Sequence, residues 1–195
     1  ISKFLVDEEI THICLLNSDV IVSDYWIDRL LEKEFDIVSC VTNKADSEQC
    51  VPCDYDFSKE ECITSNNKLD IKVFNRINDY SQRWYESWSG NIVEAEPTYF
   101  CVVISKKVFQ QVGLLDETFF PGGFEDDDYC IRSKSLGFTS YLARDVFMHH
   151  WGSGSFGQLQ HQFFSERAKK NKTYLETKHN IIWKRRPERP FVSFF

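Results

Sequence analysis

Short apolar segments alternate along the chain with segments of helical periodicity. Residues Thr11–Leu16 are nearly all apolar, as in a strand buried inside a parallel sheet. Residues Tyr25–Glu34 then alternate apolar and charged side chains at helical spacing, and Asp36–Val41 form a second apolar run. A strand, helix, strand order is typical of parallel sheets, because parallel neighbours need a crossover between them. The pattern therefore predicts an α/β fold with a mostly parallel sheet flanked by helices.

The later segments continue this alternation. The pattern predicts helices over Leu69–Ser89, Ser105–Val112 and Gln158–His179, and the end of an amphipathic helix over Ile1–Glu9. A further helix begins at the acidic residues after Phe124 and closes at Gly137. Strands are predicted over Tyr99–Ile104, Phe138–Leu142 and Val146–His149. Aromatic side chains recur at helical spacing in Leu69–Ser89. We expect them to pack against the sheet rather than to line a pocket.

The composition is typical of one globular domain. The chain has 195 residues, of which 42% are hydrophobic, which suffices for one sizeable core. No apolar run approaches the roughly eighteen residues of a membrane helix. The first residues lack the basic-then-apolar order of a signal peptide, and the scattered cysteines favour reduced thiols in the cytosol, so we expect a cytoplasmic protein. The formal net charge of -7 argues against a nucleic-acid partner.

Seven scattered cysteines do not resemble a secreted disulfide framework, because their number is odd. Three of them, Cys50, Cys53 and Cys62, lie in the polar stretch Thr42–Lys68, which we interpret as a variable surface loop in contact with a substrate. A C-x-x-C pair is half of a zinc site, but no second pair or nearby histidine completes four ligands. Free thiols are the default interpretation, and a zinc site is the alternative.

Four consecutive carboxylates, Glu125–Asp128, follow the glycine pair Gly122 and Gly123. The helix dipole favours acidic residues in a first turn, which explains one or two of them. Crowded like charges raise one another's pKa and cost stability, so the full cluster indicates a bound cation or a proton transfer. Helical spacing separates the four, so one carboxylate can face a cleft while another pairs with Arg132.

Three polar stations follow predicted elements: Asn17–Asp19, Glu125–Asp128 and His149–Ser155. Open α/β sheets bind ligands at the carboxyl ends of their strands, where we expect these stations to converge. Carboxylates suit Mg²⁺ or Mn²⁺, and one imidazole shifts the preference toward Mn²⁺. Each station alone has an ordinary interpretation as a turn, a helix cap or a surface loop; their order along one chain favours a divalent-metal site.

These motifs together resemble the family 2 glycosyltransferases with the GT-A fold, over Ile1 to about Phe156. The matching segments are Cys14–Asp19, similar to a strand ending in a D-x-D-type triplet with Asn17 in the first place; Phe100–Phe119, similar to the acceptor-side segment; Glu125–Asp128 with Arg132 and Gly137, similar to the E-D-x-D motif; and Asp145–Phe156, similar to the closing histidine loop. The Gly122-Gly123 pair is also similar to the β-1,4-galactosyltransferases.

The resemblance implies an inverting transfer of a sugar from a nucleoside-diphosphate sugar to a hydroxyl of a glycan or lipid-linked acceptor, as in cell-surface polysaccharide synthesis. It implies Mn²⁺ or Mg²⁺ on the diphosphate, and it implies these site residues: Asn17, Ser18 and Asp19 for the sugar nucleotide, Asp19 and His150 for the metal with His149 as the alternative, Asp126 as general base, Glu125 to orient the acceptor, and Gly122, Gly123, Phe124 and Asp127 around the acceptor. Asp128 and Arg132 are implied to brace the helix.

The family's nucleotide-holding strand and loop come before the part that this chain matches. We therefore interpret residues 1–156 as the metal- and acceptor-binding part of a catalytic domain, and residues 157–195 as a C-terminal helix and basic tail packed on it. The basic tail is a solvated amphipathic helix or, in the alternative, a patch that contacts anionic lipids peripherally. Two other functions stay open: a catalytically silent carbohydrate-binding or scaffold domain, and a metal-dependent phosphoesterase.

Overall fold

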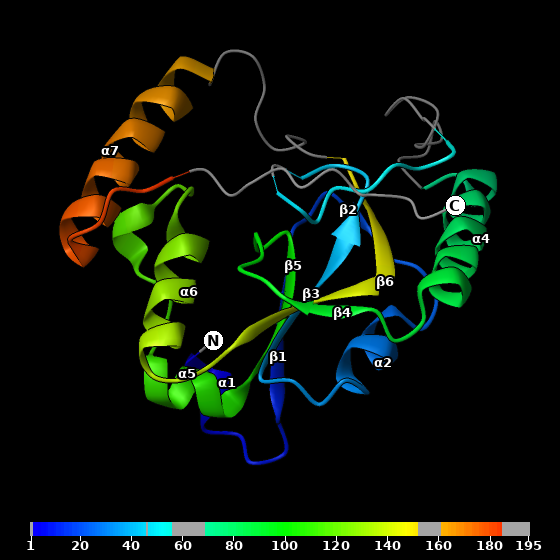
Figure 1. Cartoon of the computed structure of the whole chain (residues 1–195), viewed down its shortest axis with the longest axis horizontal. Coiled ribbons are helices and arrows are strands. Elements are labelled where there is room, and N and C mark those ends of the chain that lie inside the picture. The colour runs from blue at the N-terminus through cyan, green and yellow to red at the C-terminus, as the bar shows by residue number, and fades with distance from the viewer. Residues whose placement is uncertain (1, 46, 56–68, 152–160, 185–195) are drawn as a thin grey trace.

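The structure is a computed structural model that describes residues 2–45, 47–55, 69–151 and 161–184 (Figure 1). Within these ranges six strands form one mixed sheet in the order β1-β5-β3-β6-β2, and β4 also pairs with β6. The strands are β1 His12–Leu16, β2 Val20–Ile21, β3 Ile37–Thr42, β4 Ile92–Glu94, β5 Cys101–Ser105 and β6 Ser140–His150. The predicted α/β class is confirmed.

Helices flank this sheet, with α2 and α4 on one side in Figure 1 and α5, α6 and α7 on the other. Their bounds are α1 Ser2–Leu5, α2 Trp26–Leu31, α4 Ile71–Trp88, α5 Lys106–Val112, the short 3₁₀ helix η1 Glu117–Phe119, α6 Glu125–Ser135 and α7 His161–His179. No described helix has the length and apolarity to cross a membrane.

The prediction of a mostly parallel sheet is wrong. β1 and β3 point the same way, as the strand, helix, strand pattern predicts, but β5 lies between them and pairs antiparallel with both. The parallel pair in the described sheet is β3 with β6, whereas β2 and β4 join β6 antiparallel. Apolar runs indicate burial and not strand order. The sequence therefore predicted the strand β5 but not its position between β1 and β3.

Two further corrections concern single strands. β1 lies at the edge of the described sheet and is only partly buried, with Leu16 43% exposed, so the fully buried strand expected there is wrong. The two strands expected between Phe138 and His149 are one continuous β6. Its pairing with β3 shifts by several residues at one point, because Cys40 faces Ala143 while the next residue of β3 faces Phe147. This irregularity replaces the predicted break.

The core lies on both faces of the sheet. Alternate residues of β5 point to opposite sides, so that Val103 packs with α2 residues such as Leu30 and Val102 packs with Phe109 of α5. The aromatic stripe of α4 is buried against β6, with Tyr80 and Trp84 in one apolar cluster. The expectation that these aromatic side chains pack rather than line a pocket is confirmed for them.

The carboxyl ends of three strands lie at the same end of the sheet. Because β1, β3 and β6 run in the same direction, their carboxyl ends share an edge with the start of β5. The polar residues after β1 and at the end of β6 lie at this edge, and β2 pairs directly with the last residues of β6. The sheet therefore positions two of the three predicted stations next to each other.

Candidate functional site

An aspartate and a histidine meet at this edge. Asp19 lies in the turn between β1 and β2, and His150 is the last residue of β6. Asp19 Oδ1 is 3.2 Å from His150 Nε2, and both side chains are largely buried. The backbone fixes this approach, since Val20 is registered opposite His150 and the Trp151 amide donates to the Asp19 carbonyl at 3.0 Å. The structure thus brings together the two residues that the sequence suggested as metal ligands.

The His150 ring is held by its other nitrogen. Nδ1 lies 2.9 Å from the Lys44 carbonyl oxygen, and a carbonyl only accepts, so Nδ1 carries the proton. The His150 amide donates to Asn43 Oδ1 at 2.8 Å, and the ring stacks on Phe100 at a centroid distance of 5.2 Å. The other ring nitrogen, Nε2, therefore faces Asp19. Histidine ligands are commonly oriented by such a second hydrogen bond.

His149 faces away from Asp19, because neighbouring strand residues alternate sides. Its Nδ1 lies 3.2 Å from the Tyr55 hydroxyl, and its ring packs edge-on against Trp151 at 4.9 Å. The side chain is 4% exposed. Of the two candidate histidines, the described contacts place His150 at the aspartate.

The other residues of the first station border open space. The Asn17 amide donates to the Phe100 carbonyl at 2.8 Å, which holds the turn against the start of β5. Ser18 and Asp19 line a cavity of about 370 Å³ whose remaining walls come from β2 and the residues Val22, Leu69, Phe74 and Trp151. The glycine-rich residues 152–155, expected to close the histidine loop, lie outside the described residues.

The second station begins α6. Gly122 and Gly123 have φ of 146° and 93°, a region that side chains rarely adopt, which explains the glycine pair. Phe124 caps the helix in a left-handed conformation without a side-chain cap, and its ring packs on Trp183 at 5.0 Å. Glu125–Asp128 then form the first turn, as the sequence predicted.

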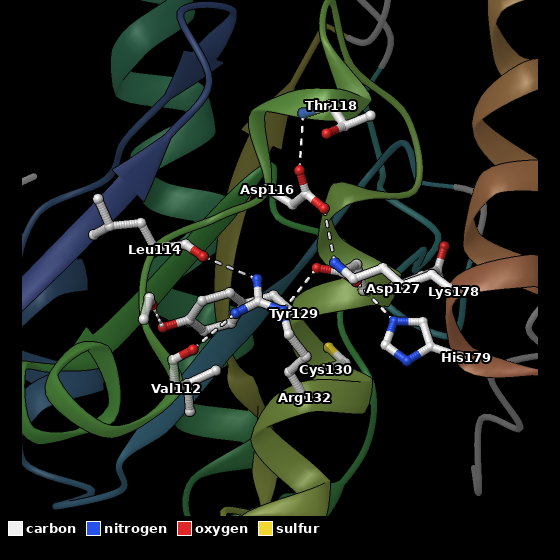
Figure 2. Close-up of polar contacts among 12 residues, drawn as sticks. Val112, Leu114, Asp116, Thr118, Asp127, Tyr129, Cys130, Arg132, Lys178 and His179 are labelled. Atoms are coloured by element: carbon white, nitrogen blue, oxygen red, sulfur yellow. Dashed lines mark hydrogen bonds and ion pairs between the residues drawn. The ribbon is translucent and has the colours of Figure 1, made fainter.

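Asp128 is the structural member of this turn. It is 0% exposed and accepts a hydrogen bond from Arg132 Nε at 2.8 Å. The expected pairing of one carboxylate with Arg132 is thus confirmed, and the pair joins two successive turns of α6. Lys178 and His179, which Figure 2 labels, reach it from α7 at 2.6 and 2.7 Å. Burial by itself raises the pKa of Asp128, but the hydrogen bonds from these partners outweigh it and lower the pKa below its usual value.

Asp116, just before η1, joins the same cluster. Its carboxylate accepts from Lys178 at 2.8 Å, from the Thr118 amide at 2.9 Å and from the Tyr174 hydroxyl at 3.0 Å. The Lys178 hydrogen bond is the main reason that the pKa of Asp116 lies far below its usual value. The shared lysine ties the segment before α6 to α7.

Asp126 lies on the side of α6 that faces the start of β5. It is close enough to Tyr99 for its charge to act on that phenol, whose pKa burial raises well above the usual value, with Cys130 and Asp126 adding to the effect. The next residue, Phe100, stacks on His150. Tyr99 and Phe100 are neighbours in the chain, but their side chains belong to different core clusters, Tyr99 with Tyr129 and Phe100 with Val103. The Asp127 amide donates to Asp126 Oδ1 at 2.9 Å.

Glu125 faces a separate cavity of about 430 Å³. The walls come from the segment before α6, namely Leu115, Asp116, Glu117, Phe119, Phe120, Pro121 and Gly122, together with Glu125. The Glu125 atom Oε2 is buried and has no hydrogen-bond partner among the described residues. The four carboxylates thus have different surroundings, and only Asp128 is neutralised by several basic side chains in the described contacts.

Sequence reasoning missed the contribution of α7. Asn171 is 3% exposed and donates to three carbonyls of the segment before α6, and Arg167 donates to the Phe120 carbonyl. Asn171 stands among lysines in the sequence, so no local pattern marks it as buried. Arg167 and Lys178 bond inward, in contrast to the solvated basic helix that the sequence favoured. The basic residues after Lys184 lie outside the described residues.

The thiols and the metal ligands can now be compared with expectation. Cys50 and Cys53 form no disulfide with a described cysteine, and their thiols donate to the Asn43 and Tyr55 carbonyls; Cys62 lies outside the described residues. Within the described ranges no three His, Cys, Asp or Glu side chains gather as a metal-binding group. A site built on Asp19 and His150 would therefore take further oxygen ligands from a substrate. Mg²⁺ sites commonly do so, with one or two carboxylates plus substrate phosphates.

Comparison with known proteins adds no family assignment. No protein-family model matches the chain, and no curated protein matches it either.

Proposed function

We propose that this chain forms the metal- and acceptor-binding sides of an inverting family 2 glycosyltransferase with a GT-A fold. The donor is a nucleoside-diphosphate sugar, and the acceptor is a hydroxyl of a glycan or of a lipid-linked saccharide. The proposal draws on the motif resemblance and on the α/β sheet, which brings the first and third polar stations, Asp19 and His150, together at one edge.

The observation that carries the proposal is the Asp19–His150 pair. When the His150 ring is neutral, with its proton on Nδ1, its Nε2 is an acceptor that faces the acceptor oxygen of Asp19 at 3.2 Å. Two facing acceptors repel unless a proton or a cation lies between them. An oxygen and an imidazole nitrogen suit Mn²⁺, and also Mg²⁺. Such an ion would neutralise the charge that develops on the departing diphosphate.

Asp126 has the surroundings expected of the general base. Its carboxylate is in the first turn of α6, near enough to the buried Tyr99 to act on its charge, and Asp128 is held in ion pairs. In the proposed reaction Asp126 removes the proton of the acceptor hydroxyl while that oxygen attacks the anomeric carbon. The bond to the diphosphate oxygen breaks as the new glycosidic bond forms, so the configuration inverts.

Glu125 and Gly122 line the cavity beside Asp126, so they are the acceptor residues that the contacts favour. Asp127 and Gly123 remain proposed acceptor residues because they lie close to Glu125 and Gly122 in the sequence. The Phe124 ring packs on Trp183, so in the proposal Phe124 supports the turn. Asn17 and Ser18 lie next to Asp19 at the donor side.

The test is the Mn²⁺-dependent release of nucleoside diphosphate from a panel of nucleotide sugars by the purified protein that contains this chain. We expect turnover with at least one donor, and its loss with a chelator and in Asp19→Asn and His150→Ala. Asp24→Asn is the matched control, because Asp24 is an exposed aspartate shortly after β2 that bonds to Asn78. This variant should keep the activity of the parent.

Other outcomes identify the competing functions. Hydrolysis of phosphate monoesters without any turnover of nucleotide sugars would indicate a phosphoesterase. Saccharide binding without turnover would indicate a silent carbohydrate-binding domain. In either case the transferase proposal fails.

A further inference from the structure

The segment between η1 and α6 exposes an aromatic ring at the rim of the Glu125 cavity. Phe120 is 75% exposed, although the preceding Phe119 is 1% exposed and belongs to the interior. An exposed aromatic ring offers apolar area that a ligand gains free energy by covering. The adjoining cavity of about 430 Å³ is large enough for a ligand of several heavy atoms.

The backbone below this ring is fixed by α7. Asn171 Nδ2 donates to the carbonyls of Phe119, Gly122 and Gly123 at 2.8, 3.1 and 3.1 Å. Arg167 Nε donates to the Phe120 carbonyl at 2.7 Å. Four carbonyls of one short segment are thus bonded to two side chains of a neighbouring helix. Phe120 is presented outward from a held backbone, which favours binding because little order is lost.

The cavity also offers one hydrogen-bond acceptor that the described protein does not satisfy. Glu125 Oε2 is buried without a partner there, which is costly unless a ligand donates to it. The other carboxylate with a described bonding network, Asp116, already accepts from Thr118, Tyr174 and Lys178. Three acidic side chains line this cavity, so an anionic ligand is disfavoured.

The ligand that fits has a flat apolar face, hydroxyl donors and no negative charge, and a pyranose ring has all three. We propose that Phe120 and Glu125 form a saccharide platform, on which a neutral pyranose stacks against the Phe120 ring and donates a hydroxyl hydrogen bond to Glu125. In this arrangement Asn171 and Arg167 are positioning residues. The inference builds on the proposed function, because it identifies this pyranose as the acceptor.

Saturation-transfer difference NMR tests the platform without any donor or metal. The probes are neutral methyl pyranosides that span the common hexoses, N-acetylhexosamines and 6-deoxyhexoses. We expect at least one to bind the purified protein, with its ring protons saturated from aromatic resonances. Phe120→Ala should weaken that probe about 5- to 10-fold, from the lost contact area. Phe120→Tyr should restore it, and Glu125→Gln should weaken binding.

Phe4→Ala is the matched control, because Phe4 is another exposed phenylalanine, 54% exposed on α1. This variant should bind the probe as the parent does. Absence of binding by every probe, or equal weakening by Phe4→Ala and Phe120→Ala, would overturn the platform. Binding through Phe120 together with no nucleotide-sugar turnover would keep the platform and reject the transferase. If the protein transfers sugar and Phe120→Ala leaves the acceptor KM unchanged, the transferase proposal stands and the platform is rejected.

Discussion

At the scale of single residues, identical side chains have different chemistry because their neighbours differ. Asp126 and Asp128 are two positions apart in the first turn of α6. Asp128 is buried among Arg132, Lys178 and His179, which hold it as a charged structural group. Asp126 instead lies toward Tyr99 and the sheet edge. In the proposed reaction Asp128 is the structural carboxylate of this turn and Asp126 is the one that takes a proton.

Replacing the proposed base should separate chemistry from binding. Asp126→Asn should lower kcat for transfer by about 10²- to 10⁴-fold, the usual contribution of a general base. Mn²⁺ affinity, measured by titration calorimetry with donor present, should stay within about 3-fold, because this is close to the resolution of such comparisons. Asp28→Asn is the control, since Asp28 is an exposed aspartate in the first turn of α2. Intact transfer by Asp126→Asn would exclude it as the base.

At the scale of elements, α7 organises the segment that enters α6. The contacts of Asn171 fix backbone carbonyls, whereas Lys178 and His179 fix the side chain of Asp128. Figure 1 shows α6 and α7 side by side, apart from the sheet edge where β2 meets β6. The geometry of the acidic turn therefore depends on a helix that carries none of the proposed catalytic groups.

Loss of the Asn171 hydrogen bonds should loosen this segment. Asn171→Leu is similar in volume but removes the donor shared by the Phe119, Gly122 and Gly123 carbonyls, which should cost about 1–3 kcal/mol of unfolding free energy. Acceptor KM should rise more than kcat falls, while Mn²⁺ affinity at Asp19 and His150 stays unchanged. Chemical denaturation and steady-state kinetics measure both effects. Thr173→Ala is the control on α7, because Thr173 is exposed and bonds to Lys169 of its own helix.

A parallel fall of kcat, KM and metal affinity in Asn171→Leu would indicate general unfolding and contradict a positioning role. No change in the acceptor KM would contradict it as well.

The sequence predicted most elements because periodicity records burial locally. The stripe of α4, the acidic start of α6 and its end at Gly137 follow from helical spacing and glycine. Strand order was beyond reach, because the antiparallel β5 between β1 and β3 depends on pairing between distant segments. The two-residue β2 is too short for a recognisable alternation.

The candidate site shows the same division. Asp19 and His150 were predictable as polar residues next to strand ends, and they meet at 3.2 Å. The sequence already favoured His150 over His149, and the alternation of side chains along β6 places His150 at Asp19. Asn171 and Arg167 could not be predicted, because their targets are backbone carbonyls some 50 positions away, which leave no side-chain pattern.

At the scale of the whole molecule, a buried ionic cluster links the segment before α6 with α6 and α7. Asp116 and Asp128 both have a pKa below the usual carboxyl range in the folded state. These two carboxylates therefore bind protons more weakly in the folded protein than in the unfolded chain. Their stabilisation is complete above the unfolded carboxyl pKa and is lost as pH falls through the folded pKa.

The free energy of unfolding should therefore decrease as pH is lowered from about 5 to about 2. Asp128→Asn should be less stable near neutral pH and should show a smaller pH dependence over this range. Urea unfolding at several pH values measures both quantities. Glu96→Gln is the control, because Glu96 forms an exposed ion pair with Lys134. A pH dependence identical in Asp128→Asn and the parent would contradict the assignment.

The central claim is that the Asp19–His150 pair and the acidic turn with Asp126 act together in an inverting sugar transfer. Proton NMR of the product anomeric centre tests it most directly, in a reaction of the purified protein with Mn²⁺, nucleotide sugar and a saccharide acceptor. The account predicts a new glycosidic linkage whose anomeric configuration is opposite to that of the donor, absent in Asp19→Asn and nearly absent in Asp126→Asn. A product that retains the donor configuration, or no linkage with any nucleotide sugar, would contradict it.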